Sequence, residues 1–160
     1  AEKVAVAIRE FRGVEHRLEW VREKDGVVYY NNSKATNPAA TIAALGALDR
    51  PVVLIAGGLE RNMDYTDLIP SLKRKVKAVV AIGQTREKIR QAAELAGISK
   101  VKVVDTATNA AEVIDEAVKA ASAFAEAGDI VLLSPACASW DMFASYEERG
   151  SMFKQSVHNL

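Results

Sequence analysis

The stretch Pro51–Gly58, which reads PVVLIAGG, is a run of apolar and mostly β-branched residues that ends in two glycines. Its length and composition predict a buried strand over residues 51–56. A second short apolar run, IVLL at residues 130–133, predicts another strand of the same kind. Longer stretches of helical character separate such runs along the chain. This alternation is typical of a mostly parallel sheet that helices cover on both faces.

The other expected elements surround these two strands. A compact turn at Lys24-Asp25-Gly26 separates two β-rich runs, so residues 18–22 and 27–31 should form a hairpin. Asn37 followed by Pro38 is a good helix start, because Asn caps a helix and Pro suits its first turn. We expect further strands at 78–82 and 102–104, helices at 37–48, 65–74, 86–96 and 109–125, a helical segment that carries Trp140, Phe143 and Tyr146 on one core-facing side, and a last helical segment over 152–157.

The sequence therefore predicts one α/β domain over residues 1–160, with a Rossmann-like three-layer α/β/α architecture, a mostly parallel sheet and an antiparallel edge hairpin. Of the 160 residues, 49% are hydrophobic, which is ordinary for a globular domain. The 21 Lys and Arg residues balance 21 Asp and Glu residues. Zero net charge argues against broad binding of nucleic acid or an anionic membrane, but it leaves room for one anion pocket built from a few cations.

Features of secreted and membrane proteins are missing from the sequence. Cys137 is the only cysteine, so no disulfide can form within the chain, which fits a reducing cytoplasm. Residues 1–10 hold no apolar signal-peptide core, and no apolar run has the length of a membrane span. His16, Cys137 and His158 show no metal-ligand spacing, so we expect no metal site. These features predict a cytoplasmic protein.

Two polar loops follow predicted strands, and ligands in such folds gather at the carboxyl ends of strands. In residues 31–37, Lys34 offers a charge for a carboxylate or a phosphate, and the simpler alternative is a capped helix beside a solvated lysine. In residues 57–62, the two glycines allow close approach of the backbone, and the simpler alternative is a turn with an exposed Arg61.

A third polar loop follows the strand at 130–133. Cys137 has no nearby histidine to act as a base, so we expect a buried small residue there and not a nucleophile. Ser139 is expected to cap the helical segment that follows. Neither a P-loop nor a dinucleotide-binding fingerprint occurs anywhere in the chain.

These loops make the chain resemble the C-terminal domain of the Mur ligases, and among them the type that adds D-glutamate. The resemblance covers essentially the whole chain and implies the α/β fold described above. The Ser-Lys-Ala-Thr-Asn and Ser-Pro-Ala-Cys-Ala-Ser segments are specific for this type, whereas the His-Arg and Gly-Gly segments are shared more widely. The matching segments are VEHRLE at 14–19, NNSKATNP at 31–38, LIAGG at 54–58 with Arg61 and Asp64-Tyr65, LLSPACASWDMF at 132–143 and EERGSMF at 147–153.

The resemblance implies a part of an ATP-dependent ligase of peptidoglycan biosynthesis that adds D-glutamate to UDP-N-acetylmuramoyl-L-alanine through an acyl phosphate. Enzymes of this family have a UDP-binding domain, a central ATPase domain that holds the P-loop and the Mg²⁺ ligands, and a third domain that closes over the amino acid. This chain resembles only the third domain. The resemblance therefore places most contacts to ATP and Mg²⁺ on domains outside this sequence, and it implies no turnover by this chain alone.

The resemblance also implies roles for single residues. Lys34 and Thr36 resemble residues of the family that contact D-glutamate, and Ser139 resembles the residue that binds the side-chain carboxylate of D-glutamate. Arg61 stands at the place of a basic residue in the Gly-Gly loop, and the resemblance implies that it is the second cation for D-glutamate. Tyr146 stands where the family often has Phe, and the resemblance implies that it lines the same pocket.

Two further residues are implied as nucleotide contacts. Arg17 is similar to the arginine that reaches the ATP phosphates. Asn32 stands where many members have an Asp that contacts the ribose, and its amide can still accept a hydrogen bond but carries no charge.

Other functions remain open on residue types alone. One is a stand-alone module that binds a small anion at its strand ends without chemistry. Another is a purely structural or interaction domain, which would expose an apolar surface and lack functional loops. A third is a Mur ligase that adds L-alanine, a diamino acid or D-Ala-D-Ala, against which the two specific segments argue.

Overall fold

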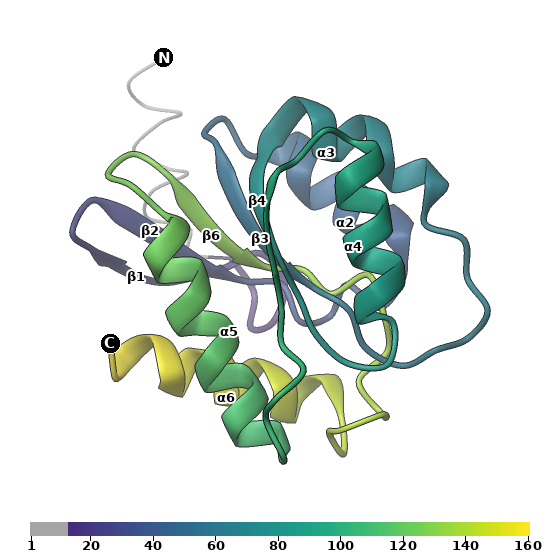
Figure 1. Cartoon of the computed structure of the whole chain (residues 1–160). Helices are drawn as coiled ribbons and strands as arrows, with labels where there is room; N and C mark the ends of the chain where they lie inside the picture. The colour runs from purple at the N-terminus through teal and green to yellow at the C-terminus, as the bar shows by residue number, and fades with distance from the viewer. Residues whose placement is uncertain (1–12) are drawn as a thin grey trace.

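The computed structural model describes residues 13–160 and contains one six-stranded sheet in the order β1-β2-β6-β3-β4-β5 (Figure 1). Strands β1 and β2 pair antiparallel, and the other neighbouring pairs are parallel. The predicted sheet with an antiparallel edge hairpin is confirmed. The strands are β1 Glu19–Lys24, β2 Val27–Asn31, β3 Val52–Ala56, β4 Val76–Ala81, β5 Lys100–Val103 and β6 Ile130–Leu133.

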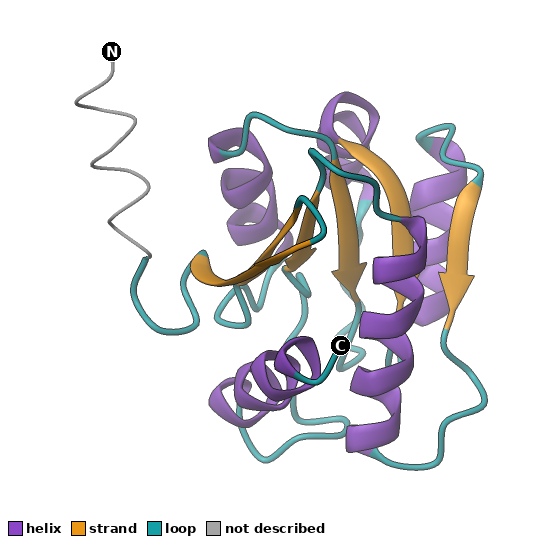
Figure 2. Ribbon diagram, turned by 90° about the vertical axis from the view of Figure 1, so that its left-hand side faces the viewer, coloured by secondary structure: helices purple, strands orange, loops and turns teal. Residues whose placement is uncertain are grey.

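Helices cover both faces of the sheet (Figures 1 and 2). On one face Leu45, Leu72 and Ile89 from three helices share a core with the sheet, and on the other face Val118 and Phe153 do so. The helices are α2 Pro38–Ala47, α3 Ile69–Lys75 and α4 Arg86–Leu95 on the first face, and α5 Ala110–Phe124 and α6 Tyr146–His158 on the second, with a 3₁₀ turn η1 at Thr66–Leu68. The three-layer architecture follows from this division.

Strand β3 is central to both cores, because every one of its residues is buried. Leu54 belongs to the core under α2, α3 and α4, whereas Val53 and Ile55 belong to the core under α5 and α6. Leu54 pairs with Leu132 of β6, so the two apolar runs that the sequence singles out lie side by side in the sheet. A strand that is apolar on both faces is what a doubly covered parallel sheet requires.

The C-terminal region differs from the prediction. Two helical segments were expected, but residues 139–145 form turns and only one helix, α6, follows. Ser145, not Ser139, caps this helix, because its side chain accepts a hydrogen bond from the backbone N–H of Glu148. Trp140 is 63% exposed and Phe143 is 4% exposed, so the aromatic residues do not share one core-facing helix side.

Smaller differences concern boundaries. The expected helix at 65–74 divides into η1 and α3, and Pro70 stands in the first turn of α3, where its missing N–H costs nothing. Asn37 caps α2 as predicted, since its side chain accepts from the N–H of Ala40. The expectation for residues 1–10 lies outside the described residues. Within residues 13–160, no helix is both long and apolar enough to cross a membrane.

Candidate functional site

The carboxyl ends of the parallel strands bring the three predicted loops together. The N–H of Asn32 donates to the carbonyl oxygen of Leu133 at 2.7 Å, which joins the loop after β2 to the loop after β6. The N–H groups of Gly57 and Leu59 donate to the carbonyl oxygens of Pro135 and Ala138, both at 2.9 Å, which joins the loop after β3 to the same loop. Backbone hydrogen bonds thus build one continuous edge from three distant segments.

Arg149 of α6 is hydrogen-bonded to two of the loops that form this edge, and it was not among the predicted site residues. Its guanidinium is fully buried and donates to the Ser33 Oγ atom at 2.9 Å, the Ser33 carbonyl oxygen at 2.6 Å and the Cys137 carbonyl oxygen at 2.9 Å. Burial lowers the pKa of Arg149 to about 10, and the nearby Cys137 and Asp141 oppose that change. An arginine within the Glu-Glu-Arg-Gly segment of a helix gives no sequence signal of burial.

A second buried polar group lies beside Arg149. The Asn31 side-chain amide contacts the His16 Nδ1 atom at 2.9 Å and donates to Glu19 Oε1 at 3.0 Å, while its oxygen accepts from the N–H of Ser33 at 3.1 Å. Gly150 leaves the room for this group, because a Cβ atom there would lie 2.1 Å from His16 Nδ1. These contacts position the backbone next to Arg17 and Lys34.

The predicted cations lie at the surface of the edge, and two of them rest on aromatic rings. Lys34 Nζ lies 5.8 Å from the ring centroid of Tyr146, and the Arg61 guanidinium carbon lies 4.9 Å from the ring centroid of Trp140. Such contacts orient a cation without neutralising it. The structure therefore brings Lys34 and Tyr146 together as expected, and it adds Trp140, which was predicted to lie in the core.

The predicted site residues with hydroxyl or amide side chains, Thr36, Ser139 and Asn32, are less exposed to solvent than the cations. Thr36 is half-buried, and Ser139 is 2% exposed. The Asn32 oxygen accepts from the N–H of Leu18 at 3.0 Å, and its amide nitrogen donates to Ser134 Oγ at 3.1 Å. Asn32 therefore ties its loop to neighbouring segments through both ends of its side chain.

A fourth loop, residues 82–85 after β4, also belongs to the edge and was not predicted. Thr85 forms two hydrogen bonds with Gly58. Its N–H donates to the Gly58 carbonyl oxygen at 3.1 Å, and its Oγ1 accepts from the Gly58 N–H at 3.1 Å. The Cys137 Sγ atom lies 3.4 Å from Thr85 Oγ1 and 3.0 Å from the Tyr65 hydroxyl. Cys137 is buried, as expected, and burial raises the pKa of its thiol.

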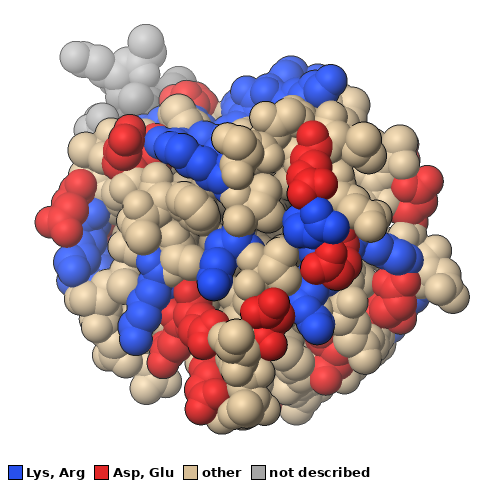
Figure 3. Space-filling model, viewed as in Figure 1, with Lys and Arg blue, Asp and Glu red and all other residues tan. Residues whose placement is uncertain are grey.

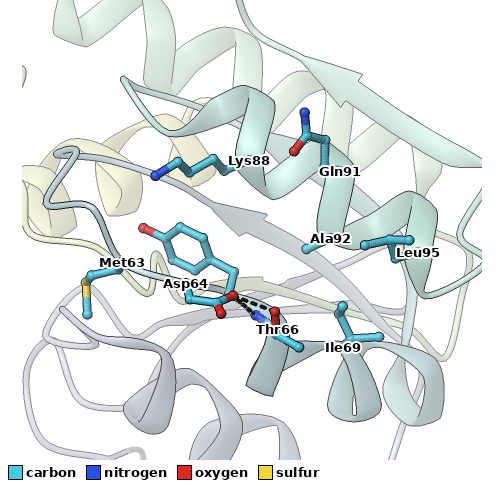
Figure 4. A pocket seen from close by; sticks show the side chains of 9 residues that line it. Met63, Asp64, Thr66, Ile69, Lys88, Gln91, Ala92 and Leu95 are labelled. Carbon is cyan, nitrogen blue, oxygen red and sulfur yellow. Dashed lines mark hydrogen bonds between the residues drawn. The ribbon is translucent and has the colours of Figure 1, made fainter.

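A pocket of about 340 Å³ lies next to these loops, between the end of the loop after β3 and helix α4 (Figure 4). Met63 and Asp64 form one wall, and Lys88 and Gln91 of α4 form the other. Lys88 also pairs with Glu60 in the same loop as Arg61. None of the residues predicted to contact D-glutamate or ATP lines this pocket, so it is separate from the predicted site.

Asp141, in the loop after β6, contacts the loop after β4 and yields a pH-dependent prediction. Its Oδ2 accepts from the N–H of Gln84 at 3.2 Å, and its buried Oδ1 has no hydrogen-bond partner within residues 13–160. Burial raises the pKa of the Asp141 carboxyl. A raised folded-state pKa adds stability below the unfolded value, near 3.9, and this stability is lost as the pH rises through the folded value.

We therefore expect Asp141→Asn to stabilise the chain at pH 7, by less than about 1 kcal/mol because the side chain is only partly buried. Urea unfolding at pH 7 and at pH 3.5 measures the effect, which should shrink at the lower pH. The control is Asp105→Asn at an exposed position, which should change little at either pH. A loss of stability at pH 7 in Asp141→Asn would contradict this account.

The fold and the edge together define a Rossmann-like α/β domain that presents cations at the carboxyl ends of its strands. The chain belongs to the family described as Mur ligase, glutamate ligase domain, whose model matches residues 16–137. It is 50% identical over 159 residues to the UDP-N-acetylmuramoylalanine--D-glutamate ligase of Bacillus cereus strain B4264, and 49% identical to the ligase of the same name from Bacillus thuringiensis strain Al Hakam. These alignments cover 99% of this chain and 34% of each relative, so the chain spans about a third of their length.

Solved structures share the fold at low sequence identity. One is a MurF ligase from Thermotoga maritima in complex with ADP, at a TM-score of 0.52 and 20% identity, covering 92% of this chain and 32% of that one. Another is a domain from a putative UDP-N-acetylmuramate:L-alanyl-gamma-D-glutamyl-medo-diaminopimelate ligase of Haemophilus ducreyi, at a TM-score of 0.55 and 18% identity, covering 89% and 98%. At such identities the likeness supports the fold alone.

Proposed function

We propose that this chain is the D-glutamate-binding domain of a UDP-N-acetylmuramoyl-L-alanine:D-glutamate ligase, an ATP-dependent enzyme that forms an amide bond. The observation that carries the proposal is the pair of exposed cations, Lys34 and Arg61, each of which lies over an aromatic ring at one edge of the sheet. The identity of 50% with relatives of that name supports it.

The chemistry of D-glutamate suits this edge. At neutral pH the amino acid carries two carboxylates and one ammonium group. Lys34 and Arg61 offer two cations for the carboxylates, and Thr36 and Ser139 offer hydroxyl donors. Because Ser139 is 2% exposed, we expect its loop to open when the ligand binds. Held by its carboxylates, the ligand would leave its amine free to attack the activated acyl carbon, so these residues contribute orientation and exchange no proton.

ATP would contact fewer residues of this chain than D-glutamate would. ATP supplies the phosphoryl group that activates the acyl carboxylate. Arg17 is exposed, and its side chain has no partner within residues 13–160, so it fits a phosphate. The Asn32 oxygen already accepts one hydrogen bond, so a ribose hydroxyl would be a second donor to it.

We further propose that Mg²⁺ and most of the nucleotide bind to other domains of a longer protein. Within the described residues, no group of three or more His, Cys, Asp or Glu side chains could hold a metal ion. A P-loop is absent from this sequence. Since the reaction consumes ATP and a nucleotide sugar, we assign it to the cytoplasm.

A two-dimensional NMR titration with D-glutamate, and with L-glutamate as control, tests the proposal. We expect resonances at Lys34, Thr36, Arg61 and Ser139 to shift selectively with the D-isomer. If millimolar D-glutamate shifts nothing, the titration is repeated on a protein that includes the preceding domains. Shifts that appear only there would mean that domain closure completes the pocket. No shifts in either protein would refute the amino-acid role.

Trp140 gives a related prediction of moderate size. Trp140→Leu removes the ring under Arg61, so we expect D-glutamate binding to weaken about two- to fivefold, in line with an exposed cation–π contact. Trp140→Phe should restore part of the affinity, because it keeps an aromatic face. Since Trp140 is exposed, the thermal unfolding midpoint should stay the same in both variants. Equal affinities in the parent chain and in Trp140→Leu would show that the ring does not orient Arg61.

A further inference from the structure

A basic hollow lies at the edge of the sheet opposite the candidate site. It has a volume of about 410 Å³ and lies where β3 and β4 begin and α3 ends. Figure 3 shows Lys and Arg side chains gathered at the top of the molecule, where Figure 1 places α3. The lining residues are Asp49, Arg50, Pro51, Lys73, Arg74, Lys75, Val76 and Lys77.

Four of the five cations that line this basic hollow are unpaired. Lys77 is neutralised, because its Nζ atom lies 2.7 Å from Asp129 Oδ2 and 3.5 Å from Glu126 Oε2. The others form no ion pair and no side-chain hydrogen bond with any residue of the described range, 13–160; they are Arg50, Lys73, Arg74 and Lys75. One acid, Asp49, lines the hollow with them. In a chain of zero net charge, this local excess of positive charge needs a physical reason.

Stabilisation of helix α3 explains only part of this excess of positive charge. Lys73, Arg74 and Lys75 stand in the last turn of α3, where a cation interacts favourably with the helix dipole. That helix has only seven residues, and Arg50 is not part of it. Because Arg50 lines the same hollow from the segment before β3, the four cations around it come from two separate segments.

We infer that this basic hollow binds a small, multiply phosphorylated compound. Two guanidinium groups, Arg50 and Arg74, have the planar geometry that binds phosphate oxygens in pairs, and the two lysines add charge. The volume suits a compact ligand. The large apolar side chains that are exposed within the described residues are Val14, Leu95 and Trp140, and none lines the hollow, so nothing there would insert into a membrane. This site does not depend on the proposed ligase function.

The test is an NMR titration of this chain with pyrophosphate at low salt, with orthophosphate as the weaker comparison. We expect residues 49–51 and 73–77 to shift in a saturable way, and 500 mM NaCl to weaken the binding several-fold because Arg50, Lys73 and Arg74 are exposed. Lys73→Ala/Lys75→Ala should weaken pyrophosphate binding at least about tenfold. The matched control is Lys100→Ala/Lys102→Ala, which removes two exposed lysines at the same spacing from β5 and should change affinity less than about twofold.

A further variant separates geometry from charge. Arg50→Lys/Arg74→Lys keeps the net charge but loses paired binding of phosphate oxygens, so we expect weaker binding of pyrophosphate than in the parent chain. Three results would overturn the inference. One is an equal loss in the β5 control, and another is a set of shifts confined to Arg17, Lys34 and Arg61. The last is that the chain binds phosphatidylglycerol vesicles while pyrophosphate shifts none of its NMR resonances, which would indicate a membrane surface as the partner.

Discussion

Replacing Arg149 with methionine should lower the free energy of unfolding by about 3 kcal/mol or more. The substitution leaves the carbonyl oxygens of Ser33 and Cys137 buried without the donor that they have now, and each such loss costs about 1–3 kcal/mol. Methionine fills part of the volume, so the loss of hydrogen bonds dominates. For a chain of this size the unfolding midpoint should fall by about 6–12 °C.

Thermal and urea unfolding measure this effect against a matched arginine. Arg90→Met removes an arginine that pairs with Glu87 and Glu94 on the exposed side of α4, and such pairs contribute about 1 kcal/mol or less. A loss in Arg149→Met no larger than in Arg90→Met would contradict the role assigned to the buried guanidinium. Because Arg149 joins the loops that carry Lys34 and Ser139, we also expect weaker D-glutamate binding in Arg149→Met.

Lys34→Ala should weaken D-glutamate binding by about 10- to 100-fold. Under the proposed function, the substitution removes one charge-assisted hydrogen bond to a carboxylate, which contributes about 1.5–3 kcal/mol. In the complete ligase the effect should show as a higher KM for D-glutamate, and Ser139→Ala should raise the same KM. Steady-state kinetics with D-glutamate varied at saturating ATP would measure both.

Two features keep this second prediction specific. Lys34 is exposed, so its removal should leave the unfolding midpoint unchanged. Lys24→Ala, at the last residue of β1, removes a lysine far from the carboxyl ends of the parallel strands and should not change the KM. Unchanged kinetics in both Lys34→Ala and Ser139→Ala would eliminate the assignment of these two residues to D-glutamate.

Much of the fold could be predicted because its signals are local. An apolar run such as residues 51–56 is too short for a buried helix and is fully apolar, so it predicts a strand covered on both faces. The Asn37-Pro38 pair predicts a helix start for equally local reasons. The C-terminal aromatic residues misled the prediction, because their spacing of three residues suits a helix, whereas residues 139–145 form turns.

The candidate site was predictable only in part. Loops that follow parallel strands meet at one edge of the sheet, so the meeting of the loops at 31–37, 57–62 and 133–143 follows from strand order. The contact between Arg61 and Trp140 could not be predicted, because the two residues are 79 positions apart in the sequence and a cation–π contact has no local pattern.

Hydrophobic periodicity and turn chemistry are properties of neighbouring residues, so they were enough to predict the α/β class, the mostly parallel sheet and the three polar loops at strand ends. The burial of Arg149 beneath those loops, and the hydrogen bonds between Thr85 in a fourth loop and Gly58, emerge only when the chain is folded. The same holds for the hollow that Arg50 and the basic end of α3 line together. These contacts join segments far apart in the chain, and their energies depend on burial, which no short stretch of sequence encodes.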